Sequence, residues 1–506
     1  MRLPIGIQDF AKLRQNNYLY VDKTMYMMPF IEGGAYFFAR PRRFGKSLLL
    51  STLKAAFEGR KDLFSDLWLF SHHDFKPHPI VRLDFSNVNF RSKNLDEGIV
   101  DWLRINALQY GYELKSSNAQ DALREIILEF SKINKVVVLI DEYDKPITDY
   151  LLEPEKRAEH QAILKSVYGV LKPLDEYLHL VLLTGVSKIG KLSLFSDLNN
   201  LQDISLNEKY TSLCGYTKSE IETVFGQHLE AVALRQSLSM SDLWELTTYW
   251  YNGYSWDGKT RLYCSFSFLV FLEQKKFSSF WYETGTPTFL LKLIRSAQLN
   301  PLEFDSSEMD ASGITTTDVE HLDAVSLMFQ TGYLTIKTVR SFAGQETYEL
   351  GYPNQEVRQA FSSSLIGEYS QLVPSQISQF GVALYKALLN LDWQTLFAKV
   401  NQILASIPYE IFPARESYVH SLMHLMLTST GFRTQSQLQT SLGRMDTLVT
   451  TPSHQIIFEF KVSGTAEQAV QQINTSGYAD GFEKPVVKVG VLFDLEQKCV
   501  TDWAVE

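Results

Sequence analysis

The chain has 506 residues, 45% of them hydrophobic and 13% aromatic, and its formal net charge at pH 7 is −10. This length and composition predict a globular protein with about three domains, each with material for a core. The cysteines Cys214, Cys264 and Cys499 stand far apart, which excludes a disulfide framework and a C-x-x-C zinc site. The acidic balance excludes a uniformly basic surface, so any nucleic-acid contact must come from local patches.

The first ten residues, MRLPIGIQDF, contain no basic stretch followed by an apolar run. No apolar run elsewhere approaches the roughly 18 residues that a membrane span needs. We therefore expect no membrane partner and a cytoplasmic protein in a reducing compartment.

Residues 40–50, RPRRFGKSLLL, end like a phosphate-binding loop, although Arg40 stands where such a loop usually has its first glycine. The preceding AYFFA predicts a buried strand, and residues 48–57 predict an apolar-faced helix. Lys46 would reach the β- and γ-phosphates, and the Ser47 hydroxyl would bind Mg²⁺. On this motif alone, an ordinary basic turn before a helix stays an open alternative. The candidate nucleotide-binding residues of the loop are Arg42, Arg43, Phe44, Gly45, Lys46, Ser47 and Leu48.

A second stretch, KVVVLIDEYDKP at residues 135–146, is an apolar strand that ends in two adjacent acids. Asp141 would bind Mg²⁺ from the carboxyl end of the strand, and Glu142 would polarise the attacking water. The stretch IVRLDFS also ends a strand in an acid, Asp84, but no glutamate follows it. We expect that stretch to be another core strand.

A further apolar strand, residues 180–183, is followed by Thr184. This threonine fits either a sensor of the γ-phosphate or a hydroxyl that caps the strand end, and the sequence leaves both open. Strands that alternate with helices predict an α/β sheet with its ligand at the carboxyl ends of the strands.

Longer stretches then carry a family resemblance: LPIGIQDFAKLRQNNYLYVDKT, ARPRRFGKSLLLSTLKAAFEG, LIDEYDKPI and TGVSKIGKLSLFSDLNNL. They resemble the AAA-ATPase-like family whose members commonly carry a C-terminal PD-(D/E)XK nuclease domain. The resemblance continues through CGYTKSEI and YWYNGYSW and covers nearly the whole chain. In that family the phosphate loop reads R-P-R-R-F-G-K-S, so the resemblance itself implies the absent glycine. It also implies ATP and Mg²⁺ as cofactors and an AAA-like P-loop ATPase domain over residues 1–206.

The region after this domain is expected to organise the molecule rather than to catalyse. Residues 207–300 predict a helical, lid-like region with an aromatic cluster of Trp250, Tyr251, Tyr254 and Trp256. Such a cluster could cover the nucleotide, but it is more typical of a hydrophobic core.

Residues 301–375 predict a winged-helix-like region. The helix-like HLDAVSLMFQTG leads into the strand YLTIKTV, a polar turn and the return strand TYELGYP. Winged helices bind DNA or pack against a neighbouring domain. The candidate helix has few basic residues, which favours packing against the ATPase and transmission of its state.

Residues 376–506 are expected to form a helical connection and a restriction-endonuclease-like α/β domain. The stretch SLGRMDTLVTTPSHQIIFEFKV has Asp446, Glu459 and Lys461 at the D-x12-E-x-K spacing of PD-(D/E)XK nucleases. Glu459 and Lys461 would share a strand face because side chains alternate along a strand. The two carboxylates would hold Mg²⁺ beside a scissile phosphate, and Lys461 would orient or deprotonate water.

Other residues extend this candidate site. Glu416 precedes a helix at which many such nucleases place an additional acid, and Gln472 lies on an amphipathic helix that resembles the family's extra nuclease motif. Gln437 departs from the family, in which glutamate is frequent at this position. His420 and His424 imitate a metal pair, but no third ligand follows, so we expect them to pack or to face DNA.

The sequence thus predicts a protein that binds and hydrolyses ATP. Its Mg²⁺-dependent nuclease domain is expected to cleave nucleic acid, with DNA as the preferred substrate, under nucleotide control. The alternative is a nucleotide-controlled switch that binds nucleic acid or protein through a non-catalytic nuclease-like domain. An arginine from a neighbouring subunit could complete the ATPase site, so a homo-oligomer is compatible with the sequence.

Overall fold

The computed structural model divides the chain into two compact units. The N-terminal unit comprises Met1–Trp281 and Ser307–Asn354, and the C-terminal unit comprises Tyr282–Ser306 and Gln355–Glu506. The residues that the structure describes are 2–195, 198–281, 288–297, 299–315, 323–407, 415–440, 443–476, 482 and 484–506. The domain boundaries expected at residues 206, 300 and 375 stay predictions.

A five-stranded parallel sheet forms the centre of the N-terminal unit, with the strand order β2-β3-β4-β1-β5. Its strands are β1 (Gly34–Ala39), β2 (Ile80–Asp84), β3 (Val136–Asp141), β4 (Leu178–Gly185) and β5 (Gln202–Asp203). The apolar runs of β3 and β4 are buried because helices cover both faces of a parallel sheet. The expected α/β fold is confirmed, and β5 is an additional strand that the sequence did not predict.

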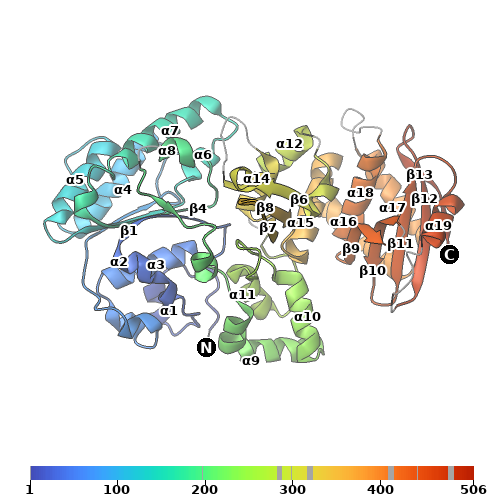
Figure 1. Cartoon of the computed structure of the whole chain (residues 1–506), viewed down its shortest axis with the longest axis horizontal. Helices are drawn as coiled ribbons and strands as arrows, with labels where there is room; N and C mark the ends of the chain where they lie inside the picture. The colour runs from blue at the N-terminus through green and yellow to red at the C-terminus, as the bar shows by residue number, and fades with distance from the viewer. Residues whose placement is uncertain are drawn as a thin grey trace. The chain divides into compact units, whose positions relative to one another are not determined.

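Helices lie on both faces of this sheet. Figure 1 shows α1, α2 and α3 on one face and α4, α5 and α7 on the other. They are α1 (Phe10–Gln15), α2 (Met28–Glu32), α3 (Lys46–Phe57), α4 (Leu95–Gln109), α5 (Ala119–Ser131), α6 (Lys145–Thr148), α7 (Pro154–Gly169) and α8 (Lys191–Leu194).

The rest of the N-terminal unit contains a helical region and a small sheet. The helices are α9 (Lys218–Gln236), α10 (Met240–Tyr251) and α11 (Ser265–Gln274). Tyr251, Tyr254 and Trp256 are buried, which confirms that these aromatic residues belong to a core. The antiparallel sheet has the order β6-β8-β7, so the predicted helix and hairpin are both present. Its elements are β6 (Ser307–Asp310), α13 (Ala311–Thr315), α14 (Ala324–Thr331), β7 (Thr335–Phe342) and β8 (Gln345–Gly351).

The C-terminal unit has a mixed five-stranded sheet with the order β13-β12-β11-β10-β9. Its strands are β9 (Arg433–Thr440), β10 (Gly443–Thr450), β11 (Gln455–Lys461), β12 (Val486–Asp494) and β13 (Cys499–Val505). The parallel pair β11 and β12 is connected through α19, which lies on one face of the sheet, with α17 and α18 on the other (Figure 1). The helices are α12 (Thr288–Ser296), α15 (Gln355–Ser370), α16 (Pro374–Leu389), α17 (Trp393–Ala405), α18 (Glu416–Ser429) and α19 (Ala466–Thr475).

None of the helices in the described part of the chain is both long and apolar enough to cross a membrane.

Candidate nucleotide and nuclease sites

The phosphate loop leads from the end of β1 into α3. Gly45 precedes α3 with φ of +99°, a left-handed conformation that glycine adopts without strain. The Lys46 ammonium is buried and donates to the backbone carbonyl oxygens of Arg40 at 2.8 Å and Pro41 at 3.0 Å. Burial holds the pKa of Lys46 below its ordinary value, although the carboxylates of Asp141 and Glu142 partly offset this effect. The lysine therefore lies inside the loop, at the start of a helix that presents unpaired N–H groups.

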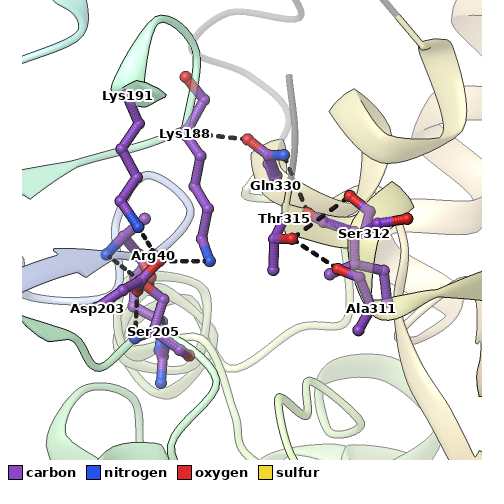
Figure 2. Close-up of polar contacts among 12 residues, drawn as sticks. Arg40, Lys188, Lys191, Asp203, Ser205, Ala311, Ser312, Thr315 and Gln330 are labelled. Carbon is purple, nitrogen blue, oxygen red and sulfur yellow. Dashed lines mark hydrogen bonds and ion pairs between the residues drawn. The ribbon is translucent and has the colours of Figure 1, made fainter. Parts of the chain in front are cut away.

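Arg40 takes a structural part in the loop. It is absent from the residues with positive φ, so its backbone does not need glycine. Its guanidinium is 1% exposed, donates to the carbonyl oxygen of Ser205 at 2.6 Å and lies 4.0 Å from the centre of the Trp256 ring (Figure 2). Burial lowers the pKa of Arg40 to about 9. The side chain thus anchors the start of the loop to the segment after β5.

The neighbouring arginines differ in exposure. Arg42 is exposed beside the loop, where its charge can meet a phosphate. The Arg43 guanidinium instead donates to the carbonyl oxygen of Phe280 at 2.7 Å and lies over the Phe266 ring. Phe44 is buried and packs edge-on against Tyr254, so it supports the loop from the core side.

Asp141 and Thr184 meet at the carboxyl ends of β3 and β4, two adjacent strands. The Thr184 hydroxyl donates to Asp141 Oδ1 at 2.6 Å, and both side chains are buried. The sequence left two roles open for Thr184. This contact adds a third role, the orientation of Asp141. Glu142 follows with φ of +52°. Burial raises the pKa of Glu142, although the Lys46 ammonium lowers it.

Asp144 is a buried acid of this site to which the sequence analysis gave no role. Its Oδ2 accepts hydrogen bonds from the Ser187 backbone N–H at 2.8 Å and the Ser187 hydroxyl at 2.7 Å. Its Oδ1 accepts from the Val186 N–H at 3.2 Å. Asp144 thereby fixes the loop that follows Thr184. The signal was visible, since Asp144 stands three residues after Asp141 in the same motif.

A pocket of about 370 Å³ opens at the phosphate loop. Beyond the loop residues and Glu142, segments that are remote in sequence line it, and the sequence analysis did not assign them to the site. These are residues 4–8, 13, 19–23, 27, 213–216 and 265–269, with gaps. The volume lies in the range of small-molecule and cofactor sites, about 300–1,000 Å³.

A hydrogen bond connects the strand end at β4 with α14, within the N-terminal unit. The Lys188 backbone N–H donates to Gln330 Oε1 at 2.6 Å, and Gln330 Nε2 donates to the Ile314 carbonyl oxygen at 3.2 Å (Figure 2). The Lys188 ammonium lies 2.8 Å from the Asp203 carboxylate. Burial tends to raise the pKa of Asp203, but Lys188 and Lys191 outweigh it and hold this pKa below its usual range.

In the C-terminal unit, β11 and α19 bring together the other predicted constellation. Gln472 contacts both functional residues of β11, because its Nε2 donates to Glu459 Oε1 and its Oε1 accepts from Lys461 Nζ at 2.8 Å. Glu459 is 3% exposed, and its Oε2 has no hydrogen-bond partner among the described residues. Burial, together with the charge of Asp446, raises the pKa of Glu459 to about 8.

Asp446 lies on β10, one position beyond the last cross-strand pair of Thr447 with Phe458, and hence beside Glu459. Its Oδ2 accepts a hydrogen bond from the Phe460 backbone N–H at 2.9 Å. His420 Nε2 lies 2.9 Å from the same oxygen, so this histidine, expected to pack or to face DNA, contacts the candidate site. No sequence spacing signals this contact, because α18 and β10 are brought together by packing.

The remaining residues discussed for the nuclease site differ in their exposure and contacts. Glu416 is exposed at the first position of α18, and its charge adds to the raised pKa of Glu459. His424 is buried and contacts the Ser436 hydroxyl, so its expected packing role is confirmed. The side chain of Gln437 lies outside the described residues.

Comparisons with known proteins find the families of both domains. Residues 4–195 match the family described as "Predicted AAA-ATPase", and residues 414–503 match the "PD-(D/E)XK nuclease superfamily". An "Uncharacterized protein in vnfD 5'region" of Azotobacter chroococcum mcd 1 is 36% identical over 521 residues, which cover 100% of this chain and 99% of that relative. The chain belongs to the predicted AAA-ATPase family and carries a C-terminal PD-(D/E)XK nuclease superfamily domain. No solved structure matches this AAA-ATPase-like protein.

The oxygen and nitrogen atoms at the two sites of this AAA-ATPase-like protein determine whether Mg²⁺ could bind there. Among the described residues, no group of three or more His, Cys, Asp and Glu side chains is arranged to hold a metal ion. Mg²⁺, however, commonly takes one or two carboxylates and keeps several waters. Asp446 and Glu459 supply two carboxylates, and the buried Glu459 Oε2 is an acceptor to which no group in the described part of the chain donates. At the nucleotide site, Ser47 and Asp141 offer one hydroxyl and one carboxylate.

Proposed function

We propose that this protein binds and hydrolyses ATP with Mg²⁺ and that its C-terminal domain cleaves phosphodiester bonds of nucleic acid under nucleotide control. The observation that carries the nuclease proposal is the connected set around Glu459. This buried carboxylate has one oxygen without a hydrogen-bond donor among the described residues, lies beside Asp446 and shares Gln472 with Lys461. An unpaired buried carboxylate oxygen is costly in a protein, and a bound cation would compensate it.

At the nucleotide site, we assign separate roles to the phosphate loop and to the strand ends. Lys46 would exchange the carbonyl oxygens of Arg40 and Pro41 for the β- and γ-phosphates. Asp141, oriented by Thr184, and Ser47 would hold Mg²⁺, which neutralises charge on the phosphates when bound. Glu142 would accept a proton from the attacking water, and its raised pKa suits a base that works near neutral pH.

At the nuclease site, Asp446 and Glu459 would hold the metal ion, which polarises the scissile phosphate when bound. Gln472 keeps Lys461 near Glu459, and Lys461 would orient the attacking water. Glu416, exposed at the start of α18, would add negative charge at the entrance to the site. We propose DNA as the preferred substrate.

The proposal of nucleotide control is supported by the contact of Lys188 with Gln330. Thr184 and Lys188 belong to one strand end and its following loop, so a shift of Asp141 on ATP binding would reach Gln330. Gln330 lies on α14, and only three residues separate the end of β8 from α15, the start of the nuclease-bearing segment.

Cleavage assays with labelled DNA and RNA, with Mg²⁺ or Mn²⁺ and with or without ATP, test the proposal. We expect Lys461→Ala to lose cutting and Lys46→Ala to cut without any response to ATP. Gln330→Met removes the amide and keeps most of the volume, so this variant should bind ATP and cut while losing part of the ATP response. Cutting that survives in Lys461→Ala would reject the nuclease assignment.

A binding switch without cleavage is the second candidate. Gln437, where relatives often have glutamate, and the raised pKa of Glu459 favour it, because a protonated glutamate binds metal poorly. Metal-independent binding of nucleic acid whose affinity changes with the bound nucleotide would support this candidate. Metal-dependent cleavage of nucleic acid would exclude it.

A further inference from the structure

One part of the nucleotide pocket, called its apolar end here, is lined by the N-terminal segment and by α11. Ile7, Leu19 and Val21 line it together with Leu269 from α11. These side chains are apolar, as expected where a flat aromatic base is to be buried rather than a phosphate. The pocket is continuous with Gly45 and the other residues of the phosphate loop, so a nucleoside attached to phosphates in the loop has this end within reach.

The local sequence determines how this segment is held. Residues 4–7 form a turn in which the Ile7 N–H donates to the Pro4 carbonyl oxygen at 3.3 Å, and Gly6 has φ of +71°. Such a turn needs glycine at its third position and accepts proline at its start. Asp9 then caps α1, and the Phe10 N–H donates to Ser51 Oγ of α3 at 2.9 Å. The segment is therefore fixed against the helix that follows the phosphate loop.

Polar side chains at this end are mostly engaged within the protein. The Lys23 ammonium lies 2.7 Å from the Glu220 carboxylate, and the Tyr20 hydroxyl is hydrogen-bonded to Thr52. Gln8 lines the pocket, is exposed, and its amide makes no hydrogen bond with any residue in the described part of the chain. One amide group, with a donor and an acceptor, is thus available to a ligand.

We infer that Gln8 recognises the Hoogsteen edge of adenine and makes the nucleotide site selective for ATP. A glutamine amide pairs with adenine by accepting from the N6 amino group and donating to N7. Guanine presents the acceptors O6 and N7 on the same edge, so one amide cannot satisfy both in the same way. The inference rests on the proposed nucleotide function and deepens it by naming the base and the group that selects it.

Competition binding against a fluorescent ADP analogue, with Mg²⁺ and the full-length protein, tests this inference. The competitors are ATP, GTP and 7-deaza-ATP, in which carbon replaces N7. We expect wild type to prefer ATP about tenfold over GTP and about fivefold over 7-deaza-ATP. Gln8→Ala should bind ATP and 7-deaza-ATP equally. Gln8→Glu keeps the shape, removes the donor and should show the same loss of N7 dependence.

Gln109→Ala, an exposed substitution at the end of α4, is the matched control and should keep the wild-type preferences. Equal binding of ATP and 7-deaza-ATP by wild type, or an unchanged preference in Gln8→Ala, overturns the inference and leaves the proposed ATP binding intact. Absence of binding of every triphosphate by wild type overturns the inference and the proposed nucleotide function together.

Discussion

Arg40 occupies a position at which phosphate loops commonly have glycine. The contacts of its side chain give a structural reason for arginine at this position. The backbone there has no positive φ, while the guanidinium donates to the Ser205 carbonyl oxygen and lies over the Trp256 ring. A residue that breaks a local motif is therefore compensated by tertiary contacts of the same loop.

Restoration of the usual glycine should accordingly harm the protein. We expect Arg40→Gly to lower the stability of the nucleotide-free N-terminal unit by about 3 kcal/mol, since a buried carbonyl oxygen loses its donor and the ring loses its partner. Thermal unfolding followed by fluorescence measures this effect. Arg42→Gly removes the same charge from the same loop at an exposed position, and an equal loss in both variants would contradict the role of Arg40.

Thr184 yields a prediction at the same scale, which rests on the proposed ATP hydrolysis. Thr184→Val keeps the shape and removes the hydroxyl that donates to Asp141 at 2.6 Å. We expect ATP hydrolysis to fall at least about tenfold, because one lost hydrogen bond to a charged group corresponds to roughly 1.5–3 kcal/mol. Phosphate release is the measurement. Thr184→Ser should restore most of the rate, and a fully active valine variant would show that the hydroxyl does not orient Asp141.

Among the secondary-structure elements, α18 places two histidines with opposite environments on one helix. His420 lies at Asp446, whereas His424 is buried beside Ser436 and Thr428. Burial lowers the pKa of His424 to about 4 from an ordinary value of 6.5. The same residue type thus serves the site at one position and the core at the next turn.

The His424 pKa makes the stability of the C-terminal unit depend on pH. Between pH 6.5 and 4, His424 is protonated in the unfolded chain but neutral in the folded unit. The contribution of His424 to the free energy of unfolding is therefore complete above pH 6.5 and decreases as the pH falls through this window. The loss approaches about 3 kcal/mol near pH 4. Urea unfolding of wild type and His424→Gln at pH 7 and pH 4.5 measures it. The glutamine variant should show a smaller difference between the two pH values, and identical differences would contradict this assignment.

The chain divides into two compact units, and the described residues that line the pocket at the phosphate loop all belong to the N-terminal one. A ligand that binds a folded unit stabilises that unit by mass action, by about 2.7 kcal/mol at 100 times its Kd. ATP analogues with Mg²⁺ should therefore raise the melting temperature of one calorimetric transition and leave the other in place. Lys46→Ala should abolish the shift. A single transition that moves as a whole would show that the units unfold together.

Much of both sites could be predicted because their key residues are close in sequence. The glycine, lysine and serine of the phosphate loop are consecutive, and Glu459 and Lys461 share a strand face by alternation alone. The run of apolar residues before Asp141 predicted a buried strand, which places the acid at the edge where parallel strands bind ligands. Periodicity and spacing act over a few residues, so a single sequence displays them.

The tertiary structure decided the contacts between segments that are remote in the chain. The anchoring of Arg40 by Ser205, the hydrogen bond of Lys188 to Gln330 and the approach of His420 to Asp446 each join different elements. Gln8 likewise lines the pocket at the phosphate loop, in a segment that the hydrogen bond from the Phe10 N–H to Ser51 Oγ ties to α3. Which distant side chains meet depends on the packing of helices and strands, which no local spacing encodes. The sequence by itself determined the chemistry that each site offers, and packing determined which groups orient it.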